Sequence, residues 1–327
     1  MTNETRQIFV GGSGRSGTTV LGQTLAAHPA IVGVDQELRL HIDPGGGQDL
    51  IQAVGPNWSP YNADAGIQAF IRLLTDARRV RLWSLPAARW GGRAIAPSRY
   101  ATLDLEAHFG GRTIDESLKK LVDSISIGVS NSRWTGTRSF SLRPSFFETA
   151  GPLDAAPAVR DFFQDLFRGR SRRLHKSPDA WVDHTPFNTL HAAALDRTFP
   201  DCTFVLMTRD PIDVFDSYMQ QHWSSDAPIL TARRLLAVFR RAEEQMRAID
   251  SHRVIRIRLE DLSKDPMEVL SELLNQLGLD MEPMIARKSQ EISCAPSLRA
   301  ARPRSSALTD PAVRRVLSEC RAVCGYE

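Results

Sequence analysis

The feature that most constrains this chain is an apolar segment that runs directly into a glycine-rich loop, IFVGGSGRSGTT at residues 8–19. The spacing from Gly12 to Thr19 is that of a P-loop, in which backbone N–H groups and a helix N-terminus face a phosphate. Thr18 stands where a P-loop has lysine, and Arg15 supplies a positive charge from another place in the loop. The pattern predicts a strand, an anion-binding loop and a helix, without the lysine that reaches a γ-phosphate.

The residues around this loop predict the first α/β unit of the chain. Gln7–Gly11 is short and apolar enough for a buried parallel strand, Gly17–Ala27 has helical spacing, and Ala30–Val34 predicts a second strand. Asp35 and Glu37 follow that second strand directly. We therefore expect both acids at the carboxyl edge of a sheet, where open α/β sheets bind ligands.

Strands and helices alternate again in the second half of the chain. We predict strands at Arg172–Lys176, Thr203–Thr208 and Arg253–Leu259, with helices at Thr185–Thr198, after Pro211, at Thr231–Ile249 and after Pro266. This alternation predicts an α/β fold, a P-loop-type central parallel sheet flanked by helices, in a single domain over residues 1–327. Residues 43–170 differ, because glycine clusters interrupt helical stretches there, and we predict a largely helical insertion.

Composition narrows the class of protein. The 41 basic and 38 acidic residues give a net charge of +3, too balanced for a general nucleic-acid binder. The four cysteines lack metal-site spacing, and so few in a long chain fit a reducing compartment. The polar start MTNETRQ predicts no signal peptide, and the lack of an apolar run of about 18 residues predicts no transmembrane segment. Together these observations predict a cytoplasmic protein.

Three basic residues share one kind of position in the predicted fold. Arg15 lies in the loop, Lys176 follows a predicted strand, and Arg209 ends another strand, with Ser217 eight residues further along. A single arginine at a strand end is commonly part of a surface ion pair. Three cations at carboxyl ends of strands favour one cleft that holds separate anionic groups of one ligand.

In the loop and in these strand-end positions, the sequence resembles the sulfotransferases that use 3′-phosphoadenosine 5′-phosphosulfate (PAPS). The 5′-phosphosulfate loop of that family commonly reads P-[KR]-[ST]-G-T-[TS], and GRSGTT stands here. Its 3′-phosphate motif is an arginine at a strand end and a serine eight residues later, which matches Arg209 and Ser217. The segment LEDLSKDPMEVLSELLNQLGL is similar to the family's C-terminal block. The likeness covers roughly residues 7–41 and 172–280 and leaves the insertion and the tail poorly matched.

Within that family, the chain is more similar to the carbohydrate, tyrosylprotein and bacterial branches than to the cytosolic phenol and steroid branch. The phenol branch has a catalytic histidine in a K-x-H motif, whereas His175 and Lys176 stand here in reverse order without a gap. The other branches place a glutamate shortly after the HP that ends the first helix, and HPAIVGVDQELR supplies Glu37. A shift of one residue would put Gln36 there, but an amide is no base. Asp35 is the second choice.

The resemblance implies transfer of a sulfuryl group from PAPS to a hydroxyl acceptor by in-line displacement, which leaves adenosine 3′,5′-bisphosphate and needs no metal. Glu37, Lys176 and Arg15 would be the catalytic groups, with Glu37 as the base and Lys176 as the positive group near sulfur. The residues that would hold the donor are Gly14, Arg15, Ser16, Gly17, Thr18, Thr19, Arg209 and Ser217. Arg302, together with Arg304, would close over the 3′-phosphate as a basic C-terminal loop.

Several alternatives stay open at this stage. His41 and His184 are further candidates for the base. The acceptor would carry its hydroxyl on a sugar, a glycolipid or a secondary metabolite, and the insertion over residues 43–170 would shape its site. A kinase or NTPase with a degenerate P-loop is a second hypothesis, and a nucleotide-binding protein without catalytic activity is a third. The sequence leaves the acceptor and the oligomeric state open.

Overall fold

The chain forms two compact units. The computed structural model describes residues 5–78, 103–130, 146–221, 224–294 and 305–326, and the backbone of 89–90 and 93–94. The first unit consists of Met1–Glu37, Ser177–Asp196 and Pro200–Glu327, and the second of Leu38–Lys176 and Arg197–Phe199. The predicted insertion over residues 43–170 falls within the second unit.

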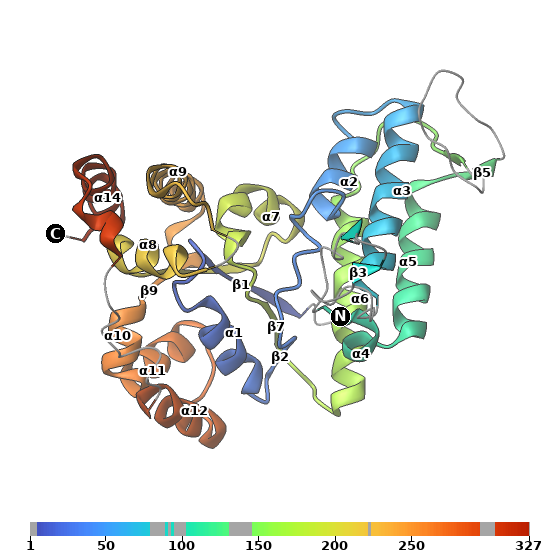
Figure 1. Ribbon diagram of the computed structural model, residues 1–327. Helices are drawn as coiled ribbons and strands as arrows, with labels where there is room; N and C mark the ends of the chain where they lie inside the picture. Colours follow the sequence, from blue (N-terminus) through green and yellow to red (C-terminus); the bar gives the residue numbers. More distant parts are fainter. Residues whose placement is uncertain are drawn as a thin grey trace. The chain divides into compact units, whose positions relative to one another are not determined.

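The first unit contains a five-stranded sheet (Figure 1). Its strands are β1 (Arg6–Gly12), β2 (Ile31–Gly33), β7 (Ala180–Asp183), β8 (Thr203–Thr208) and β9 (Val254–Arg258). They lie in the order β2-β7-β1-β8-β9, and every neighbouring pair is parallel. Because β2 and β7 lie on one side of β1 and β8 and β9 on the other, the carboxyl end of β1 is a topological switch point. The predicted central parallel sheet is confirmed.

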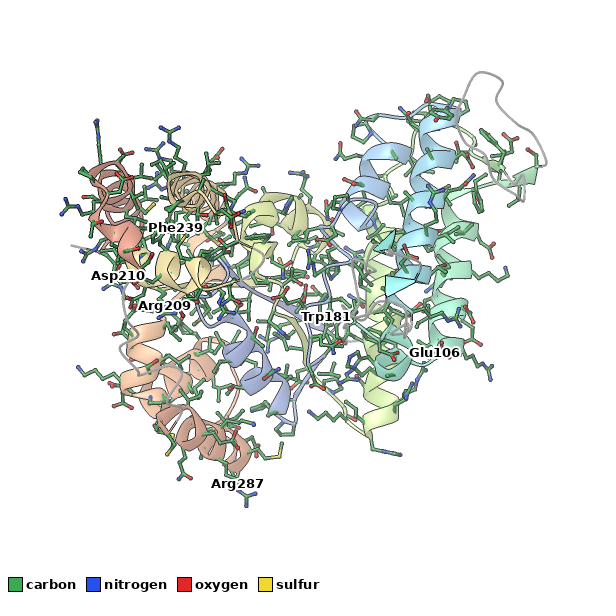
Figure 2. All side chains as sticks on the ribbon, viewed as in Figure 1. Glu106, Trp181, Arg209, Asp210, Phe239 and Arg287 are labelled. Atoms are coloured by element: carbon green, nitrogen blue, oxygen red, sulfur yellow. The ribbon has the colours of Figure 1, made fainter. Side chains whose placement is uncertain are left out.

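The strands read as nearly continuous apolar runs because helices cover both faces of a parallel sheet. Phe9 of β1 is fully buried, and its ring contacts Trp181 of β7 edge-on at 5.5 Å and stacks on Phe204 of β8 at 5.7 Å. Trp181 lies among side chains in the interior (Figure 2). These aromatic contacts join the three central strands on one face of the sheet.

Helices cover the sheet of the first unit on both faces. They are α1 (Thr18–Ala27), α7 (Ala192–Thr198), α8 (Pro211–Met219), α9 (Pro228–Arg247), α10 (Leu259–Lys264), α11 (Pro266–Gln276), α12 (Pro283–Cys294) and α14 (Pro311–Cys324), with 3₁₀ turns η2 (Pro186–His191), η3 (Ser251–Arg253) and η4 (Ser306–Thr309). On one face, Leu21 of α1 and Leu270 of α11 share an apolar cluster with Val10 of β1. On the other face lie α8, α9 and α14 (Figure 1). Buried residues of these helices, among them Phe215 and Leu317, form a second cluster.

The second unit is largely helical, as predicted for the insertion. Its helices are α2 (Gly47–Val54), α3 (Pro60–Ala77), α4 (Leu105–Phe109), α5 (Gly111–Ile125) and α6 (Ala156–Leu174). Its described part also contains two antiparallel strand pairs, β3 (Arg89–Trp90) with β4 (Arg93–Ala94) and β5 (Gly128–Ser130) with β6 (Phe146–Glu148). Its core is aromatic, since Phe162 of α6 contacts Phe70 of α3 at 5.3 Å and Phe163 at 5.1 Å.

The predicted strand at Arg172–Lys176 is wrong. Helix α6 continues to Leu174, and its last turn carries Arg172 and Arg173, whose positive charges favour a helix C-terminus. His175 then ends the helix in the left-handed conformation, with φ 51°. The strand of this region is the short, fully buried β7, which begins four residues after Lys176.

The remaining predicted strands and helices of the first unit are found close to their predicted bounds. The expected helix at Thr185–Thr198 begins as the 3₁₀ turn η2 before it becomes α7. All four cysteines are free. Within the described ranges, no helix combines the length and the apolar character that crossing a membrane requires.

Helix α1 packs very closely on the residue that follows β7. A Cβ atom on Gly22 would lie 2.3 Å from Cβ and 2.5 Å from Cγ of His184, which is fully buried. We expect Gly22→Ala to destabilise the protein by about 1–3 kcal/mol through overpacking. That cost outweighs the roughly 1 kcal/mol by which alanine favours a helix over glycine. The measurement is the thermal unfolding midpoint.

Gly128→Ala is the control, because nothing lies within 4 Å of the added Cβ at Gly128. A surface change of this kind alters stability by less than about 0.5 kcal/mol. An unfolding midpoint of Gly22→Ala that equals the wild-type value would contradict the close packing of α1 on His184.

Candidate active site

The loop between β1 and α1 has the backbone of an anion-binding turn. Gly14, Arg15 and Gly17 have φ values of 72°, 58° and 92°, all in the left-handed region. Where residues in the left-handed and the right-handed helical conformation follow one another, their backbone N–H groups point toward one place. That geometry binds anions. Gly17 is the N-cap of α1, which has neither a side-chain cap nor an acidic residue in its first turn. The positive end of the helix is therefore left for a ligand.

Ser16 adds a hydroxyl to this loop. The residue is fully buried, and its Oγ has no hydrogen-bond partner in the described part of the chain. A Cβ atom on Gly12 would lie 2.5 Å from that Oγ and 2.4 Å from the carbonyl oxygen of Met207. A side chain at Gly12 would therefore displace the serine hydroxyl. Buried hydroxyls normally have partners, so the Ser16 hydroxyl is a candidate ligand for a bound oxyanion.

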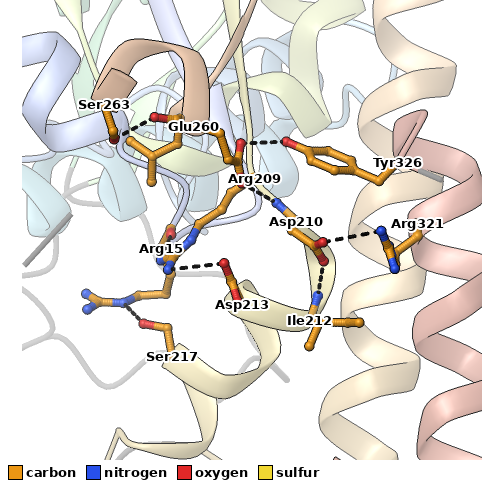
Figure 3. A network of polar contacts seen from close by, with 11 residues as sticks. Arg15, Arg209, Asp210, Ile212, Asp213, Ser217, Glu260, Ser263, Arg321 and Tyr326 are labelled. Carbon is orange, nitrogen blue, oxygen red and sulfur yellow. Dashed lines mark hydrogen bonds and ion pairs between the residues drawn. The ribbon is translucent and has the colours of Figure 1, made fainter. Parts of the chain in front are cut away.

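Two residues of α8 and one of the turn before it contact the loop. Figure 3 shows the contact of Arg15 with Ser217. The Tyr218 hydroxyl donates a buried hydrogen bond of 2.7 Å to the carbonyl oxygen of Ser13. Arg15 Nε donates to Ser217 Oγ at 3.0 Å. Arg209 Nη1, at the turn before α8, donates to the carbonyl oxygen of Arg15 at 3.3 Å. The structure thus brings the predicted loop together with the predicted arginine and serine.

The turn between β8 and α8 determines the position of Arg209. Strand β8 ends at Thr208, and Asp210 caps the helix by accepting a hydrogen bond of 2.8 Å from the backbone N–H of Ile212. Pro211 occupies the first helical position, where its missing N–H costs nothing. The Asp-Pro pair therefore starts the helix directly after Arg209. Arg209 and Asp210 lie next to each other at the start of α8 (Figure 2).

The charges of the two acids after β2 shift the pKa values of two different side chains. Glu37 is half-buried and Asp35 is exposed. Burial raises the pKa of the Tyr218 hydroxyl, Arg234 and Arg15 counteract this, and the charge of Glu37 raises the pKa further. Glu37 thus lies within electrostatic reach of the tyrosine that anchors the loop. The charge of Asp35 acts on His184 instead.

His184 follows the last residue of β7 and is fully buried. Neither ring nitrogen has a hydrogen-bond partner among the described residues. Burial lowers the pKa of the imidazole, and the charges of Asp183 and Asp35 only partly offset that effect. The ring is therefore neutral at neutral pH. It packs against Gly22 of α1.

Asp183 organises the turn that follows β7. Its buried carboxylate accepts hydrogen bonds from Thr185 Oγ1 at 2.9 Å and from Asn188 Nδ2 at 3.0 Å. These contacts hold the start of η2, which approaches β1 at Gly11. Sequence reasoning missed Asp183 and Tyr218. In the sequence, only its place at the end of a short apolar run marks Asp183, and only its place next to Ser217 marks Tyr218.

Lys176 and His41 belong to the second unit. Lys176 follows α6 and precedes β7, so the strand end that the sequence predicted for it is absent. Burial, and then repulsion from Arg170, lower the pKa of its ammonium group. The His41 ring is buried and lies 3.7 Å from the Phe163 ring, as part of the aromatic core. The catalytic role of Lys176 stays a prediction.

Two further expectations concern the tail and metal ions. Arg302 and Arg304 lie outside the described residues. In the ranges that the structure describes, no group of three or more histidine, cysteine, aspartate or glutamate side chains could hold a metal ion.

Two solved structures share the fold of this chain. The sulfotransferase domain from the Synechococcus PCC 7002 olefin synthase has a TM-score of 0.51 and 15% identity, over 98% of this chain and 94% of that one. The sulfotransferase domain from the curacin biosynthetic pathway has a TM-score of 0.50 and 15% identity, over 99% of this chain and 98% of that one. At such identities the likeness shows the α/β fold predicted from the sequence.

Sequence comparison gives the family. No curated protein sequence matches the chain. A profile of the sulfotransferase family matches residues 110–283, which are more than half of the chain and include Arg209 and Ser217. The resemblance noted in the sequence is thereby confirmed, and the chain belongs to the sulfotransferase family.

Proposed function

We propose that this sulfotransferase uses PAPS as its donor and transfers the sulfuryl group to a hydroxyl of a small-molecule, carbohydrate or lipid acceptor. The observation that carries the proposal is the contact between the loop and α8. Arg15 bonds Ser217, and Arg209 bonds the Arg15 carbonyl, so two anion-binding elements adjoin each other. PAPS carries two separate anionic groups, at its 5′ and 3′ positions. A nucleoside triphosphate lacks the separate 3′-phosphate that the second element would bind.

The loop is the proposed site of the 5′-phosphosulfate. Its binding groups are the backbone of Gly14, Arg15, Ser16, Gly17, Thr18 and Thr19, the Ser16 hydroxyl and the Arg15 guanidinium. Arg209 and Ser217 are the proposed site of the 3′-phosphate, which distinguishes PAPS from ATP. Arg302 stays a predicted further contact to that phosphate. Charge-assisted hydrogen bonds from arginine to phosphate are among the strongest in proteins.

The proposed reaction is a direct displacement at sulfur. The acceptor oxygen forms a bond to sulfur while the bond from sulfur to the bridging phosphate oxygen breaks, and Glu37 accepts the proton of the acceptor hydroxyl. Arg15 and the loop N–H groups stabilise the negative charge that develops on the leaving phosphate. The choice of Glu37 over Asp35 rests on the family resemblance, and the partial burial of Glu37 beside the exposed Asp35 agrees with it.

Lys176 keeps its proposed role near sulfur on the family resemblance alone. The acceptor specificity is proposed to reside in residues 43–170 of the second unit, whose described part is largely helical. We infer no metal requirement, because the proposed charges on the donor are met by arginine, hydroxyl and backbone groups. The test of the acceptor class is a screen of labelled PAPS against extracts of the source cells.

Ligand-induced stabilisation distinguishes this proposal from a P-loop kinase. Adenosine 3′,5′-bisphosphate, at about 100 times its dissociation constant and without Mg²⁺, is expected to stabilise the protein by about 2.7 kcal/mol. ATP at the same concentration is expected to stabilise it much less, because ATP lacks the 3′-phosphate. The measurement is the thermal unfolding midpoint with each ligand. A larger shift with Mg²⁺ and ATP would overturn the proposed donor.

Removal of the Arg209 side chain tests the 3′-phosphate site. Loss of a hydrogen bond to a charged group costs about 1.5–3 kcal/mol, so Arg209→Ala is expected to weaken bisphosphate binding by about 10- to 100-fold. Binding of adenosine 5′-monophosphate should change little. Isothermal titration calorimetry measures both affinities.

The matched control is Arg240→Ala. Arg240 is an exposed arginine that pairs with Glu319 at 3.1 Å on the surface of α9 and α14. Its loss should leave both affinities unchanged. Equal losses of bisphosphate affinity in the two variants would exclude a specific role for Arg209.

Glu37→Gln tests the base. The amide keeps the shape of the side chain but accepts no proton, so the rate of sulfuryl transfer to the identified acceptor is expected to fall about 10²- to 10⁴-fold. Bisphosphate affinity should stay at the wild-type value. Asp35→Asn, two residues earlier, is the control and should retain most of the rate. If Asp35→Asn loses the rate and Glu37→Gln keeps it, the base is Asp35.

A further inference from the structure

The chain reverses direction after α14 and brings its last described residue back to the carboxyl edge of the sheet. Gly325 is the C-cap of α14 in the left-handed conformation, with φ 69°, and the Tyr326 N–H donates to the Arg321 carbonyl at 2.9 Å. Arg258 of β9 holds this reversed end. Its Nη2 donates to the Gly325 carbonyl at 2.8 Å, and its guanidinium carbon lies 4.7 Å from the centre of the Tyr326 ring.

Glu260 connects this end of the chain to the turn that carries Arg209. One carboxylate oxygen of Glu260 accepts a hydrogen bond of 2.9 Å from the Tyr326 hydroxyl, and the other accepts one of 2.9 Å from the Asp210 N–H (Figure 3). Burial, and also the hydrogen bond to Glu260, raise the pKa of the Tyr326 phenol. The phenol therefore stays protonated and donates at neutral pH.

Two more contacts reach α8 from the same C-terminal segment. Arg321 of α14 lies 3.6 Å from the second carboxylate oxygen of Asp210, the residue that caps α8 (Figure 3). The Ser305 N–H donates to the Asp216 carboxylate at 3.0 Å, and Asp216 is buried directly before Ser217. Residues 305–326 thus hold both ends of the span from Arg209 to Ser217.

Apolar packing joins the same elements. Val313 and Leu317 of α14 are fully buried in one cluster with Val214 and Phe215 of α8. The hydrogen bond from the Asp210 N–H to Glu260 and the ion pair of Asp210 with Arg321 add polar contacts at the turn before α8.

We propose that Tyr326 and Arg321 are positioning residues that fix Arg209 in the 3′-phosphate site. The inference rests on the proposed function. Tyr326 reaches the turn at Asp210 through Glu260, and Arg321 pairs with Asp210 itself, so each acts through that turn. A guanidinium that is already held in its binding orientation loses less conformational freedom when the phosphate binds. The C-terminal end of the chain therefore contributes to donor affinity without touching the donor.

The experiment compares binding of adenosine 3′,5′-bisphosphate and adenosine 5′-monophosphate by calorimetry. Tyr326→Phe removes only the hydroxyl, and the loss of one such hydrogen bond is expected to weaken bisphosphate binding about two- to tenfold. Arg321→Gln should weaken it in the same direction, and Arg321→Lys should restore part of the loss. Monophosphate affinity should stay near the wild-type value for all three variants. Thermal unfolding confirms that each variant is folded.

A double-mutant cycle tests the route of the effect. If Tyr326 acts through Arg209, then Tyr326→Phe has no further effect on bisphosphate affinity in the Arg209→Ala background. Additive losses would overturn the inference, and so would equal losses for both nucleotides. Glu319→Gln is the control, because Glu319 belongs to α14 but pairs with Arg240 of α9, away from the turn. Its bisphosphate affinity should equal the wild-type value.

The outcomes separate the inference from the proposed function. If the wild-type protein binds the two nucleotides equally, the 3′-phosphate site is wrong and the inference falls with it. If the wild-type protein prefers the bisphosphate and Tyr326→Phe keeps that preference in full, only the positioning role is wrong.

Discussion

The hydrogen bond from Tyr218 to the Ser13 carbonyl is the contact on which the proposed donor site depends, because it fixes the loop from outside its own sequence. The loop holds Arg15 in the left-handed conformation, which costs of order 1 kcal/mol or more for a residue other than glycine. Such a conformation persists only where surrounding contacts impose it. Tyr218 and Ser217 of α8 provide those contacts, so loop and helix form one structural element.

That element is held in turn by parts of the chain far away in sequence. The turn before α8 depends on Asp210, whose N–H is bonded to Glu260 after β9. The β7 turn on the other side of β1 depends on the buried Asp183. Because β1 lies between β7 and β8, both turns adjoin the carboxyl end of β1. The order of strands therefore explains why residues from four separate segments gather around a single loop.

Local sequence patterns predicted the elements near the loop well and the turn after α6 poorly. Strands β1 and β8 are apolar runs with glycine or Asp-Pro at their ends, and such boundaries depend on neighbouring residues alone. The strand predicted at Arg172–Lys176 was wrong because β7 has only four residues and follows a basic helix end. Tyr218 and Asp183 were missed, since their contacts depend on the order of the strands and not on spacing in the sequence.

The place of the missing lysine agrees with the proposed donor. Thr18 is 3% exposed, so its side chain points into the protein, while Arg15 is exposed on the side of the loop that α8 adjoins. An ammonium group at Thr18 would need burial with a partner, which costs several kcal/mol per charge. A guanidinium at Arg15 reaches Ser217 directly. The exchange removes the ammonium group that reaches a γ-phosphate in a P-loop and leaves a guanidinium at the proposed 5′-phosphosulfate site, bonded to Ser217 of the proposed 3′-phosphate site.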